Sequence, residues 1–369
     1  MRVLILSKAC IVGQYQTKLT ALAAKSNLQL TVVVPPTWRD ERGIVPLENR
    51  PAQNFEMIVA PIRFNGHFHL HYYPTFPDIL EHVLPDILHI DEEPYNFATF
   101  HALHALRRIA PKSRVLFFSW QNLVRRYPPP FAWMEQYVYR HVNAAIAGSS
   151  ESQRVLRRKG FQKPIAIIPQ FGVPNSFAPR PSTRGSNCRV VGYAGRLVRE
   201  KGIQVLLHAL ANVNGDWQLR LLGSGPALDS LQALARELGI AARVQFIPWI
   251  SSSEMPNFYN SLDVLVVPSL TRPNWKEQFG RVLMEAMACG VPVIGSASGE
   301  IPNVISDAGI LIPENDAPSL ARALADLLSD PTRRQQLGAL GRARALANFS
   351  ERRVVDDTYA LYQKLLDTR

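Results

Sequence analysis

The sequence predicts an α/β protein made of two Rossmann-like domains, each built on a doubly wound parallel sheet. Short apolar runs alternate with helical patterns along most of the 369 residues, which is typical of parallel strands joined by helices. The alternation stops once, over residues 169–189, where Pro, Gly and Ser are frequent and no period is visible. Because this length usually exceeds one compact core, and 47% of the residues are hydrophobic, two domains are expected.

The first half holds seven apolar runs that we interpret as buried strands. The first run covers residues 3–6 and is interrupted by Ser7 and Lys8. A run this short predicts a strand rather than the core of a secretion signal. The other strands are expected at 30–34, 57–60, 87–90, 115–118, 144–147 and 165–168, with helices at 97–109 and 150–159.

The second half repeats this pattern. Strands are expected at 190–194, 219–222, 244–247, 264–267 and 292–295, and helices at 202–211, 227–238, 253–260 and 280–288. These runs predict a first domain over 1–170, a linker over 171–189, a second domain over 190–349, and a last helix over 350–369. The sequence leaves open whether that helix crosses back to the first domain. Since ligands of open parallel sheets bind beyond the carboxyl ends of the strands, we expect the two domains to face each other across a cleft.

Composition narrows the class of protein. No run of about 18 apolar residues occurs, so no membrane-spanning helix is expected. The three cysteines are far apart and lack the spacing of a disulfide framework or a structural zinc site. They predict buried, reduced thiols in a cytoplasmic protein. The alternating residues His67, His69 and His71 are expected to pack or lie at the surface rather than bind a metal.

The charge is uneven along the chain. The formal net charge is +11, and residues 1–180 carry 21 Lys and Arg against 12 Asp and Glu, which leaves +9 in that half. This excess indicates either an anionic partner, such as a membrane surface, a phosphorylated acceptor or nucleic acid, or an ordinary solvated face. The basic residues cluster at Arg107, Arg108, Lys112, Arg114, Arg125 and Arg126, and again at Arg154, Arg157, Arg158, Lys159 and Lys163.

The segment 262–296 carries the strongest signal for chemistry. A buried strand is expected to end at Pro268, a polar loop follows, and Glu277 lies in this loop just before a helix. The helix N-terminus near residues 279–281 presents unpaired backbone N–H groups, which suit an anion. Glu277 can hold sugar hydroxyls, and Glu285 inside the helix can accept hydrogen bonds from a ribose diol. Two glutamates eight apart arise about once by chance in a chain this long, so the interpretation depends on this strand–loop–helix context.

A second constellation follows the first strand of the second half. That strand ends at Gly195, and Arg196 and Lys201 follow in a loop before a helix. At the carboxyl end of a strand, an arginine fork and a lysine point charge can neutralise a diphosphate. Its place in the same sheet as the Glu277 loop favours this interpretation over a surface role.

Three stretches together resemble the retaining glycosyltransferases of family 4, which have the GT-B fold. They read GRLVREKG, LRLLGSGPALDSLQALARELGIAARVQFIPWI and EQFGRVLMEAMACGVPVIGSASGEIPNVI. The first carries the Arg…Lys pair of the family, and the last carries its E-x7-E motif with the flanking pieces. The resemblance covers residues 165–349, whereas the first half resembles the family only in layout.

The resemblance implies a role for each matching residue. Arg196 and Lys201 would bind the donor diphosphate, Glu277 would contact the donor sugar, and Glu285 would hold the ribose. Backbone at 279–280 would contact phosphate or sugar, and the turn at 248–250 would flank the nucleobase. The implied donor-binding residues are Gly13, Arg196, Lys201, Ile250, Glu277, Gln278, Phe279, Gly280 and Glu285, and those implied in catalysis are Glu277, Arg196 and Lys201.

The acceptor side is less specified. Members of the family often carry a histidine after the fourth or fifth strand of the first domain, whereas this chain reads FFSWQN there, so Trp120, Gln121 or Asn122 would stand in its place. The acidic residues Glu92 and Glu93 end a buried strand and either face the acceptor or form simple loop charge.

The resemblance implies a retaining transferase that moves a hexose-type sugar from a UDP- or GDP-sugar to a hydroxyl of a glycan, lipid-linked or small-molecule acceptor. Polysaccharide or glycolipid biosynthesis is the expected setting. No DxD signature occurs, so neither a metal nor another cofactor is expected. No nucleic-acid recognition motif accompanies the basic half. We expect a cytoplasmic protein whose first domain contacts an anionic membrane peripherally.

Two other functions remain open at this point. Gly223 and Gly225 follow a strand, as in an NAD(P)-dependent oxidoreductase, but the third glycine and the acidic residue about 20 positions on are missing. A catalytically silent nucleotide-sugar binding protein would also show this layout. The presence of Arg196, Lys201 and Glu277 together argues against it.

Overall fold

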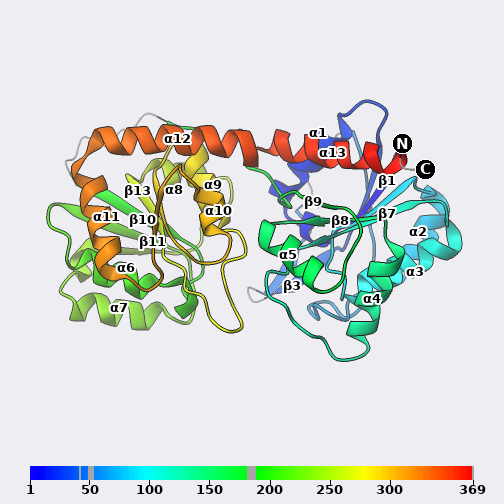
Figure 1. The fold of residues 1–369 in the computed structure, drawn as a ribbon, viewed down its shortest axis with the longest axis horizontal. Helices are drawn as coiled ribbons and strands as arrows, with labels where there is room; N and C mark the ends of the chain where they lie inside the picture. The colour runs from blue at the N-terminus through cyan, green and yellow to red at the C-terminus, as the bar shows by residue number, and fades with distance from the viewer. Residues whose placement is uncertain (41–42, 49–53, 181–187, 368–369) are drawn as a thin grey trace. The chain divides into compact units, whose positions relative to one another are not determined.

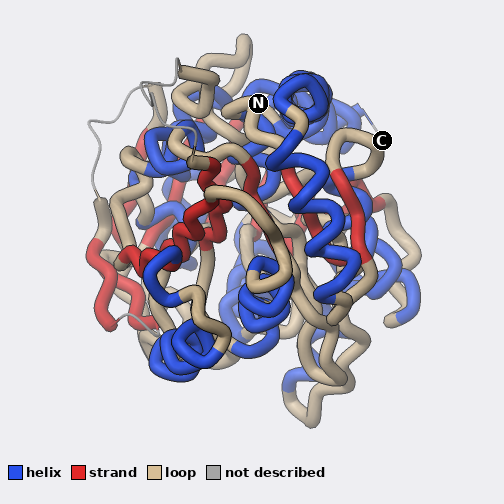
Figure 2. Tube along the Cα trace, turned by 90° about the vertical axis from the view of Figure 1, so that its left-hand side faces the viewer, coloured by secondary structure: helices blue, strands red, loops and turns tan. Residues whose placement is uncertain are grey.

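The computed structural model describes residues 1–40, 43–48, 54–180 and 188–367, and the chain divides into two compact units (Figure 1). Unit 1 comprises Met1–Gly172 and Glu351–Arg369, and unit 2 comprises Val173–Ser350. Figure 2 distinguishes the strands from the helices that cover them. Each unit contains its own parallel sheet, as the sequence predicts.

Unit 1 contains a seven-stranded parallel sheet in the order β5-β2-β1-β6-β7-β8-β9. All seven strands predicted for the first half are confirmed, with ends that differ by one residue at most. The strands are β1 (Arg2–Leu6), β2 (Gln29–Val34), β5 (Glu56–Val59), β6 (Ile87–Ile90), β7 (Arg114–Ser119), β8 (Ala144–Ala147) and β9 (Ile165–Ile167).

Helices cover both faces of this sheet because its central strands are apolar on both sides. In β1, Leu4 and Leu6 face one core, and Val3 and Ile5 face the other. The first core is closed by α2 (Phe76–Val83), α3 (Phe97–Ile109), α4 (Phe131–His141) and α5 (Ser150–Arg158). The second is closed by α1 (Gln16–Ala23) and α13 (Glu351–Asp367).

The last helix, α13, belongs to unit 1 although it follows unit 2 in the sequence. Figure 1 shows it in red beside α1. The Tyr362 hydroxyl lies 2.7 Å from Nδ1 of His89 on β6, and the Tyr359 hydroxyl donates to the carbonyl of Ser26. The helix therefore seals one face of the first sheet, which answers the question that the sequence leaves open.

Unit 2 contains a six-stranded parallel sheet in the order β12-β11-β10-β13-β14-β15. Five of its strands are predicted from the sequence. The strands are β10 (Arg189–Ala194), β11 (Trp217–Leu222), β12 (Val244–Ile247), β13 (Val264–Val267), β14 (Val293–Ser296) and β15 (Ile310–Ile312). The helices are α6 (Ile203–Leu210), α7 (Leu228–Glu237), α8 (Met255–Asn260), α9 (Arg281–Ala288), α10 (Ile301–Ile305), α11 (Ala317–Ser329) and α12 (Pro331–Phe349).

The structure adds elements that the sequence patterns do not show. Two strands, β3 (Thr37–Asp40) and β4 (Gly43–Pro46), form an antiparallel hairpin outside the main sheet of unit 1. Both are short, β3 is half-buried and β4 is largely exposed, so they lack the buried apolar run that marks a strand. The sixth strand of unit 2, β15, has only three residues at the sheet edge.

The expected linker over 171–189 differs from the structure at its start. Val173 forms a bridge with Ser350, and the buried ring of Phe177 packs against Tyr259 within unit 2. The Arg180 backbone N–H donates to Oδ1 of Asn260. Residues 173–180 therefore belong to unit 2, because two apolar side chains and the backbone find partners there. Residues 181–187 lie outside the described residues.

Candidate active site

The site in unit 2 is defined by the point where the strand order reverses. From β10 the chain proceeds to β11 on one side, and it later returns to β13 on the other side. Loops that leave two such neighbouring strands diverge and open a crevice at the carboxyl edge of the sheet. Residues 195–202 follow β10 and residues 268–280 follow β13. The topology therefore brings the two predicted constellations together.

The contact between these loops is an ion pair. The ammonium Nζ of Lys201 lies 2.6 Å from Oε2 of Glu277, and the hydroxyl of Ser269 donates to the same oxygen at 2.7 Å. The Glu277 residue is only 7% exposed, and a buried carboxylate needs such partners to remain charged. The Lys201 ammonium also lies over the Trp275 ring, 5.0 Å from its centroid.

A cavity of about 300 Å³ surrounds this pair. Arg196 and Lys201 contribute positive charge, Glu277 contributes a carboxylate, and Trp249 and Trp275 contribute flat aromatic surface. Such a combination suits a ligand that carries phosphate groups, hydroxyl groups and a planar ring. The remaining lining residues are Tyr193, Ala194, Gly195, Val267, Gln278, Gly280, Arg281 and Val282.

Arg196 is presented by the turn after β10. The hydroxyl of Tyr193, a residue buried inside the sheet, donates to the carbonyl of Arg196 at 2.8 Å. Burial raises the pKa of this phenol well above its ordinary value, so the hydroxyl remains a donor. The backbone of Arg196 is therefore fixed, whereas its side chain is exposed and lines the cavity.

Glu285 lies on α9 and is nearly buried, with both carboxylate oxygens engaged. Its Oε2 accepts a hydrogen bond of 2.7 Å from the Tyr259 hydroxyl, and its Oε1 accepts one of 2.7 Å from Nε of Arg281. Burial raises the pKa of Tyr259 well above its ordinary value, so that hydroxyl stays a donor. Glu285 does not line the 300 Å³ cavity, whereas Arg281 does.

The backbone around Glu277 is held by the turn before α10. The N–H of Glu300 donates to the Glu277 carbonyl at 3.2 Å. Gly299 has a φ of +55°, and a Cβ built on it would lie 1.9 Å from that carbonyl oxygen. Only glycine permits this approach. In the sequence this segment is visible only as part of a motif, and its contact with the Glu277 backbone is not predicted from it.

The N-terminus of α9 lies beside the same cavity. Gly280 is the N-cap residue and lines the cavity together with Gln278. Phe279 does not line it, because its ring packs edge-on against Phe349 with centroids 5.6 Å apart. The side chain of Phe279 therefore anchors the loop, and a contact with a ligand would have to come from its backbone.

At the turn that the resemblance predicts to flank a nucleobase, the residue that lines the cavity is the neighbour of the predicted one. Ile250 does not line the cavity, whereas its neighbour Trp249 does and is 49% exposed. Trp249, Trp275 and Ser269 are site residues that sequence reasoning misses. The signal that could have revealed Trp249 is the presence of a tryptophan two residues after the apolar run 244–247, in the turn that the resemblance places beside a planar base.

Gly223 and Gly225 have a packing role in this structure. A Cβ on Gly223 would lie 1.9 Å from the carbonyl oxygen of Gly195, and one on Gly225 would lie 2.4 Å from that of Leu197. Both glycines thus let two neighbouring loops touch. The resemblance to an oxidoreductase motif has this structural explanation instead.

In unit 1, the loops at the corresponding reversal point carry a buried polar cluster. Ser7 and Lys8 follow β1, and Asp91, Glu92 and Glu93 follow the neighbouring strand β6. The Ser7 hydroxyl donates to Asp91 at 2.6 Å, and Lys8 forms an ion pair with Glu92. The acidic residues end their strand as predicted, but they are bound to neighbouring loops rather than exposed.

Burial and neighbouring charge set the acidities in this cluster. Burial raises the pKa of Asp91 to about 6 and that of Glu93 to about 7. Burial also opposes ionisation of Glu92, but the charges of Lys8 and His71 outweigh it and lower the pKa of Glu92 to about 2. Glu93 accepts hydrogen bonds from the Ser119 hydroxyl at 2.6 Å and from the Trp120 N–H at 2.7 Å.

The remaining predicted residues of unit 1 are also held by internal contacts. Gln121 donates to the Tyr127 hydroxyl and accepts from Lys159, and Asn122 is buried beside it. Gly13 lies in a 3-10 turn, and its N–H donates to Oε2 of Glu48 at 2.8 Å. The structure therefore gives Gln121 and Gly13 hydrogen-bond partners within unit 1.

The cysteines and histidines fit packing roles. Cys10 and Cys289 are buried, and burial raises the pKa of each thiol to about 12. Nδ1 of His71 lies 2.9 Å from the carbonyl of Phe68, and the His69 ring packs against Tyr95. Over the described ranges, no group of three or more His, Cys, Asp and Glu residues is placed to hold a metal ion, and no helix is long and apolar enough to span a lipid bilayer.

Solved structures define the class to which this fold belongs. The chain is similar over its whole length to the sucrose-phosphate synthase of Thermosynechococcus elongatus, with a TM-score of 0.76 and 21% identity. It is similar to Anabaena HepE, solved with UDP and glucose, with a TM-score of 0.71 and 19% identity, again over 100% of both chains. The fold is therefore that of the GT-B glycosyltransferases.

One protein-family model matches the second unit. Residues 177–344 match the model of the family "Glycosyl transferases group 1". This match confirms the resemblance to family 4 glycosyltransferases that the motifs predict, and it lies within the second unit. The match includes Arg196, Lys201, Glu277 and Glu285, but not the residues of unit 1.

Curated relatives match part of this chain. A GDP-mannose-dependent alpha-(1-6)-phosphatidylinositol monomannoside mannosyltransferase of Mycolicibacterium smegmatis is 36% identical over 48% of this chain and 50% of that protein. A D-inositol 3-phosphate glycosyltransferase of Corynebacterium diphtheriae is 29% identical over 69% of this chain and 62% of that protein. The chain thus spans about half to two thirds of the length of these relatives.

Proposed function

We propose that this protein is a retaining glycosyltransferase that moves a hexose from a nucleotide-diphosphate sugar to a hydroxyl group of its acceptor. One observation carries the proposal: Arg196 and the Lys201–Glu277 ion pair line a single cavity where the strand order of unit 2 reverses. In this proposal, the cationic groups bind the diphosphate and Glu277 binds hydroxyl groups of the donor sugar.

The chemistry requires charge stabilisation rather than a protein nucleophile. When the anomeric C–O bond to the diphosphate breaks, positive charge develops on the sugar and negative charge on the leaving phosphate. Arg196, Lys201 and the N-terminus of α9 would stabilise that leaving group. Removal of one oriented donor costs about 3–4 kcal/mol in comparable sites. The departing phosphate oxygen would take the proton of the acceptor hydroxyl, which attacks from the same face.

We propose that the planar part of the donor binds to an aromatic ring of the cavity. Trp249 is half-exposed at the carboxyl edge of β12 and lines the cavity. Stacking of an aromatic ring on a flat base contributes about 1–3 kcal/mol and tolerates different bases. We therefore propose that the Trp249 ring stacks on the nucleobase and that either a UDP-sugar or a GDP-sugar serves as donor. The relatives whose names specify GDP-mannose favour including GDP-mannose in any screen.

For the acceptor, we propose a glycan, a lipid-linked sugar or a small polyol, in polysaccharide or glycolipid assembly. The names of several relatives specify inositol-containing acceptors, including phosphatidylinositol monomannoside and D-inositol 3-phosphate. In unit 1, the exposed ring of Phe68 and the partly exposed rings of His69 and Tyr127, all packed on the buried Tyr95, form an aromatic surface that offers stacking area for a sugar ring. The predicted residues Glu92, Glu93, Gln121 and Asn122 would support this surface from beneath.

We further propose that unit 1 contacts an anionic membrane surface. Trp133, Phe64 and Val124 are 70%, 57% and 51% exposed, and Arg125 and Arg126 directly follow Val124. Phe131, near Trp133, packs against His69, so the segments 64–70 and 124–133 adjoin. Apolar side chains beside basic ones are the combination that binds at an anionic lipid interface.

The experiment that tests the transferase proposal is a donor screen with product analysis. The protein is incubated with UDP-, GDP- and ADP-sugars and an inositol, glycolipid or simple sugar acceptor, and NMR spectroscopy then gives the anomeric configuration of the product. The proposal expects transfer from at least one donor with retained configuration. An inverted product would refute the retaining mechanism, and stabilisation by NAD(P) alone would refute the transferase.

A further inference from the structure

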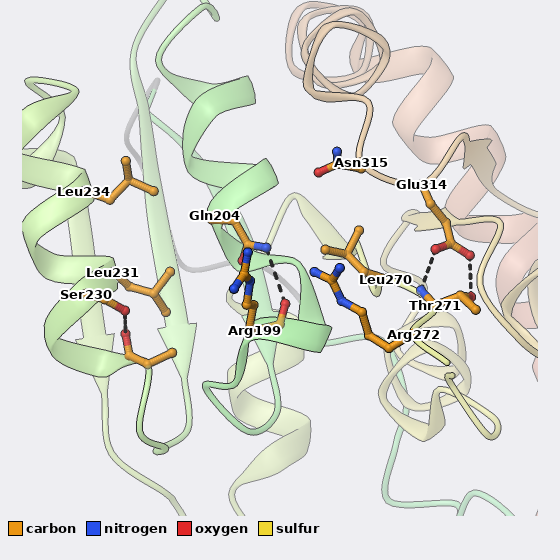
Figure 3. Close-up of a pocket in the computed structure, with 11 residues that line it drawn as sticks. Arg199, Gln204, Ser230, Leu231, Leu234, Leu270, Thr271, Arg272, Glu314 and Asn315 are labelled. Carbon is orange, nitrogen blue, oxygen red and sulfur yellow. Dashed lines mark hydrogen bonds between the residues drawn. The ribbon is translucent and has the colours of Figure 1, made fainter. Parts of the chain in front are cut away.

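Unit 2 contains a second cavity, of about 540 Å³, that the proposed transfer reaction does not use (Figure 3). It is formed by segments that follow four strands at the carboxyl edge of the sheet. Arg199 and Gln204 follow β10, Ser230 follows β11, Arg272 follows β13, and Asn315 follows β15. Leu231, Leu234 and Leu270 provide its apolar surface.

Two arginines in this cavity lack partners. Figure 3 shows Arg272 extending toward Arg199, and over the described part of the chain neither guanidinium has a hydrogen bond or an ion pair. Among the described residues that line this cavity, Glu314 is the only acidic one. Its carboxylate is turned to Thr271, whose hydroxyl donates to Oε1 at 2.6 Å and whose N–H donates to Oε2. Among the described lining residues, two arginines stand against this one carboxylate, so positive charge is in excess in the cavity.

We propose that this cavity binds a small soluble metabolite that carries a phosphate monoester. Two guanidinium groups directed into one space match the oxygens of a phosphate, which accepts paired hydrogen bonds from arginine. The side chains of Gln204, Asn315 and Ser230 suit the hydroxyl groups of a polyol or sugar. The leucine surface suits the apolar face of such a ligand. A volume of about 540 Å³ is in the range of small-ligand sites.

The cavity is connected to the donor cavity by the 3-10 helix η3 (Arg199–Lys201). Arg199 lines the 540 Å³ cavity proposed to bind phosphate, and Lys201, two residues later, forms the ion pair with Glu277. The N–H of Leu270 donates to the carbonyl of Glu200 at 2.7 Å, which ties the loop after β13 to η3. A ligand that fixes Arg199 would therefore restrict Lys201 as well.

A second connection runs through Thr271. Its hydroxyl lies 3.0 Å from that of Ser298, and the next residue, Gly299, supports the backbone of Glu277. The phosphate ligand is thus expected to change donor affinity, and by linkage the donor would change phosphate affinity by the same factor. The binding part of this inference stands alone, whereas the coupling part rests on the proposed function.

Phosphate binding is tested by calorimetric titration of the full chain with glycerol 3-phosphate and inorganic phosphate. Because the donor cavity also attracts phosphate, the titration is repeated in the Arg196→Gln/Lys201→Met variant. The proposal expects binding to persist there and to weaken at least tenfold in Arg199→Gln/Arg272→Gln, which loses both charge-assisted contacts. The Arg236→Gln/Arg322→Gln variant removes equal charge from exposed positions of unit 2 and should bind normally.

Three results would overturn the proposal: no binding of either probe, loss of binding only in the donor-cavity variant, or equal weakening in the surface control. Coupling between the two cavities is measured separately, as the change in affinity for UDP or GDP when glycerol 3-phosphate is added. It should vanish in Arg199→Gln/Arg272→Gln. If no nucleotide binds, the proposed function fails, but the phosphate titration still shows whether the 540 Å³ cavity binds phosphate. If nucleotide affinity is unchanged, the coupling fails.

Discussion

The ammonium of Lys201 and the carboxylate of Glu277, 76 positions apart in the sequence, lie 2.6 Å from each other, and both residues line one cavity. Each residue is only partly accessible, with side chains 18% and 9% exposed. Neither charge would be stable there without the other. The pair is therefore both a structural contact and the proposed donor-binding element.

This contact predicts strong non-additivity in a double-mutant cycle. Lys201→Met and Glu277→Gln should each reduce donor turnover about 100-fold or more, since each removes one oriented charge and displaces the other. The double variant should be little worse than either single variant, because residues that act as a unit do not contribute independently. Released nucleoside diphosphate is the measured quantity.

The control for this cycle is Glu237→Gln, which removes an exposed carboxylate at the end of α7 and should leave turnover unchanged. Multiplicative losses in the Lys201/Glu277 double variant would mean that the two residues act separately.

Gly299 is predicted to be intolerant of alanine. The Cβ of Gly299→Ala would meet the Glu277 carbonyl oxygen at 1.9 Å, so the loop must shift and the backbone adopt an unfavourable φ. We expect a stability loss of about 1–3 kcal/mol together with reduced turnover. Gly215→Ala, at an open position with a similarly positive φ and no atom within 4 Å, is the matched control. Equal activity of the two variants would contradict the supporting role.

The stability of unit 1 should depend on the protonation of Glu93. Its pKa is about 7 in the folded protein, against an ordinary value of 4.5. Between these values the unfolded chain has lost the proton while the folded chain keeps it, so stability falls as the pH rises from about 4.5 to about 7. The Glu93→Gln variant has no ionisable group at this position, so this fall in stability with rising pH is absent from it.

The measurement is denaturant unfolding of wild type and Glu93→Gln at several pH values. The free energy of unfolding of wild type minus that of the variant should decrease by up to about 3 kcal/mol across this window and level off above it. The contributions of Asp91 and Glu92 are present in both proteins and cancel in the difference. Parallel pH curves would show that Glu93 is ionised throughout.

Membrane contact is predicted to depend on the segment after Val124. Arg125→Gln/Arg126→Gln should weaken binding to vesicles of anionic phospholipid by about 2 kcal/mol, or some 30-fold, because each basic residue near the surface contributes about 1 kcal/mol. Binding of wild type should also weaken with added salt. Co-sedimentation measures both effects.

The comparison variant for the vesicle experiment is Arg322→Gln/Arg333→Gln, which removes two exposed charges from unit 2. If this variant loses as much binding as Arg125→Gln/Arg126→Gln, or if wild type is retained equally on neutral vesicles, unit 1 has no specific lipid-binding face.

Much of the fold could be predicted from the sequence because buried parallel strands are continuous apolar runs. Those runs locate the strands, and the order of a doubly wound sheet then places the loops after β10 and β13 side by side. The proximity of Lys201 to Glu277 follows from this topology. The family motifs that contain these two residues add their proposed role in donor binding.

What could not be predicted depends on tertiary contacts. The Tyr259 hydroxyl that binds Glu285 lies 26 positions away in another helix, and nothing in either local pattern signals the pair. The packing of Phe177 on Tyr259 likewise turns part of an apparent linker into unit 2. Trp275 follows no period, and its place over Lys201 becomes visible only once the loop is folded.

The most direct test of the central claim is a binding titration with UDP, GDP and ADP and their sugars, monitored by thermal stabilisation and calorimetry. The account predicts that wild type binds at least one nucleoside diphosphate and that Arg196→Gln/Lys201→Met weakens this binding at least tenfold, while Arg236→Gln/Arg322→Gln does not. Failure of every nucleotide to bind wild type, or undiminished binding to Arg196→Gln/Lys201→Met, would contradict the claim that this cavity holds the donor diphosphate.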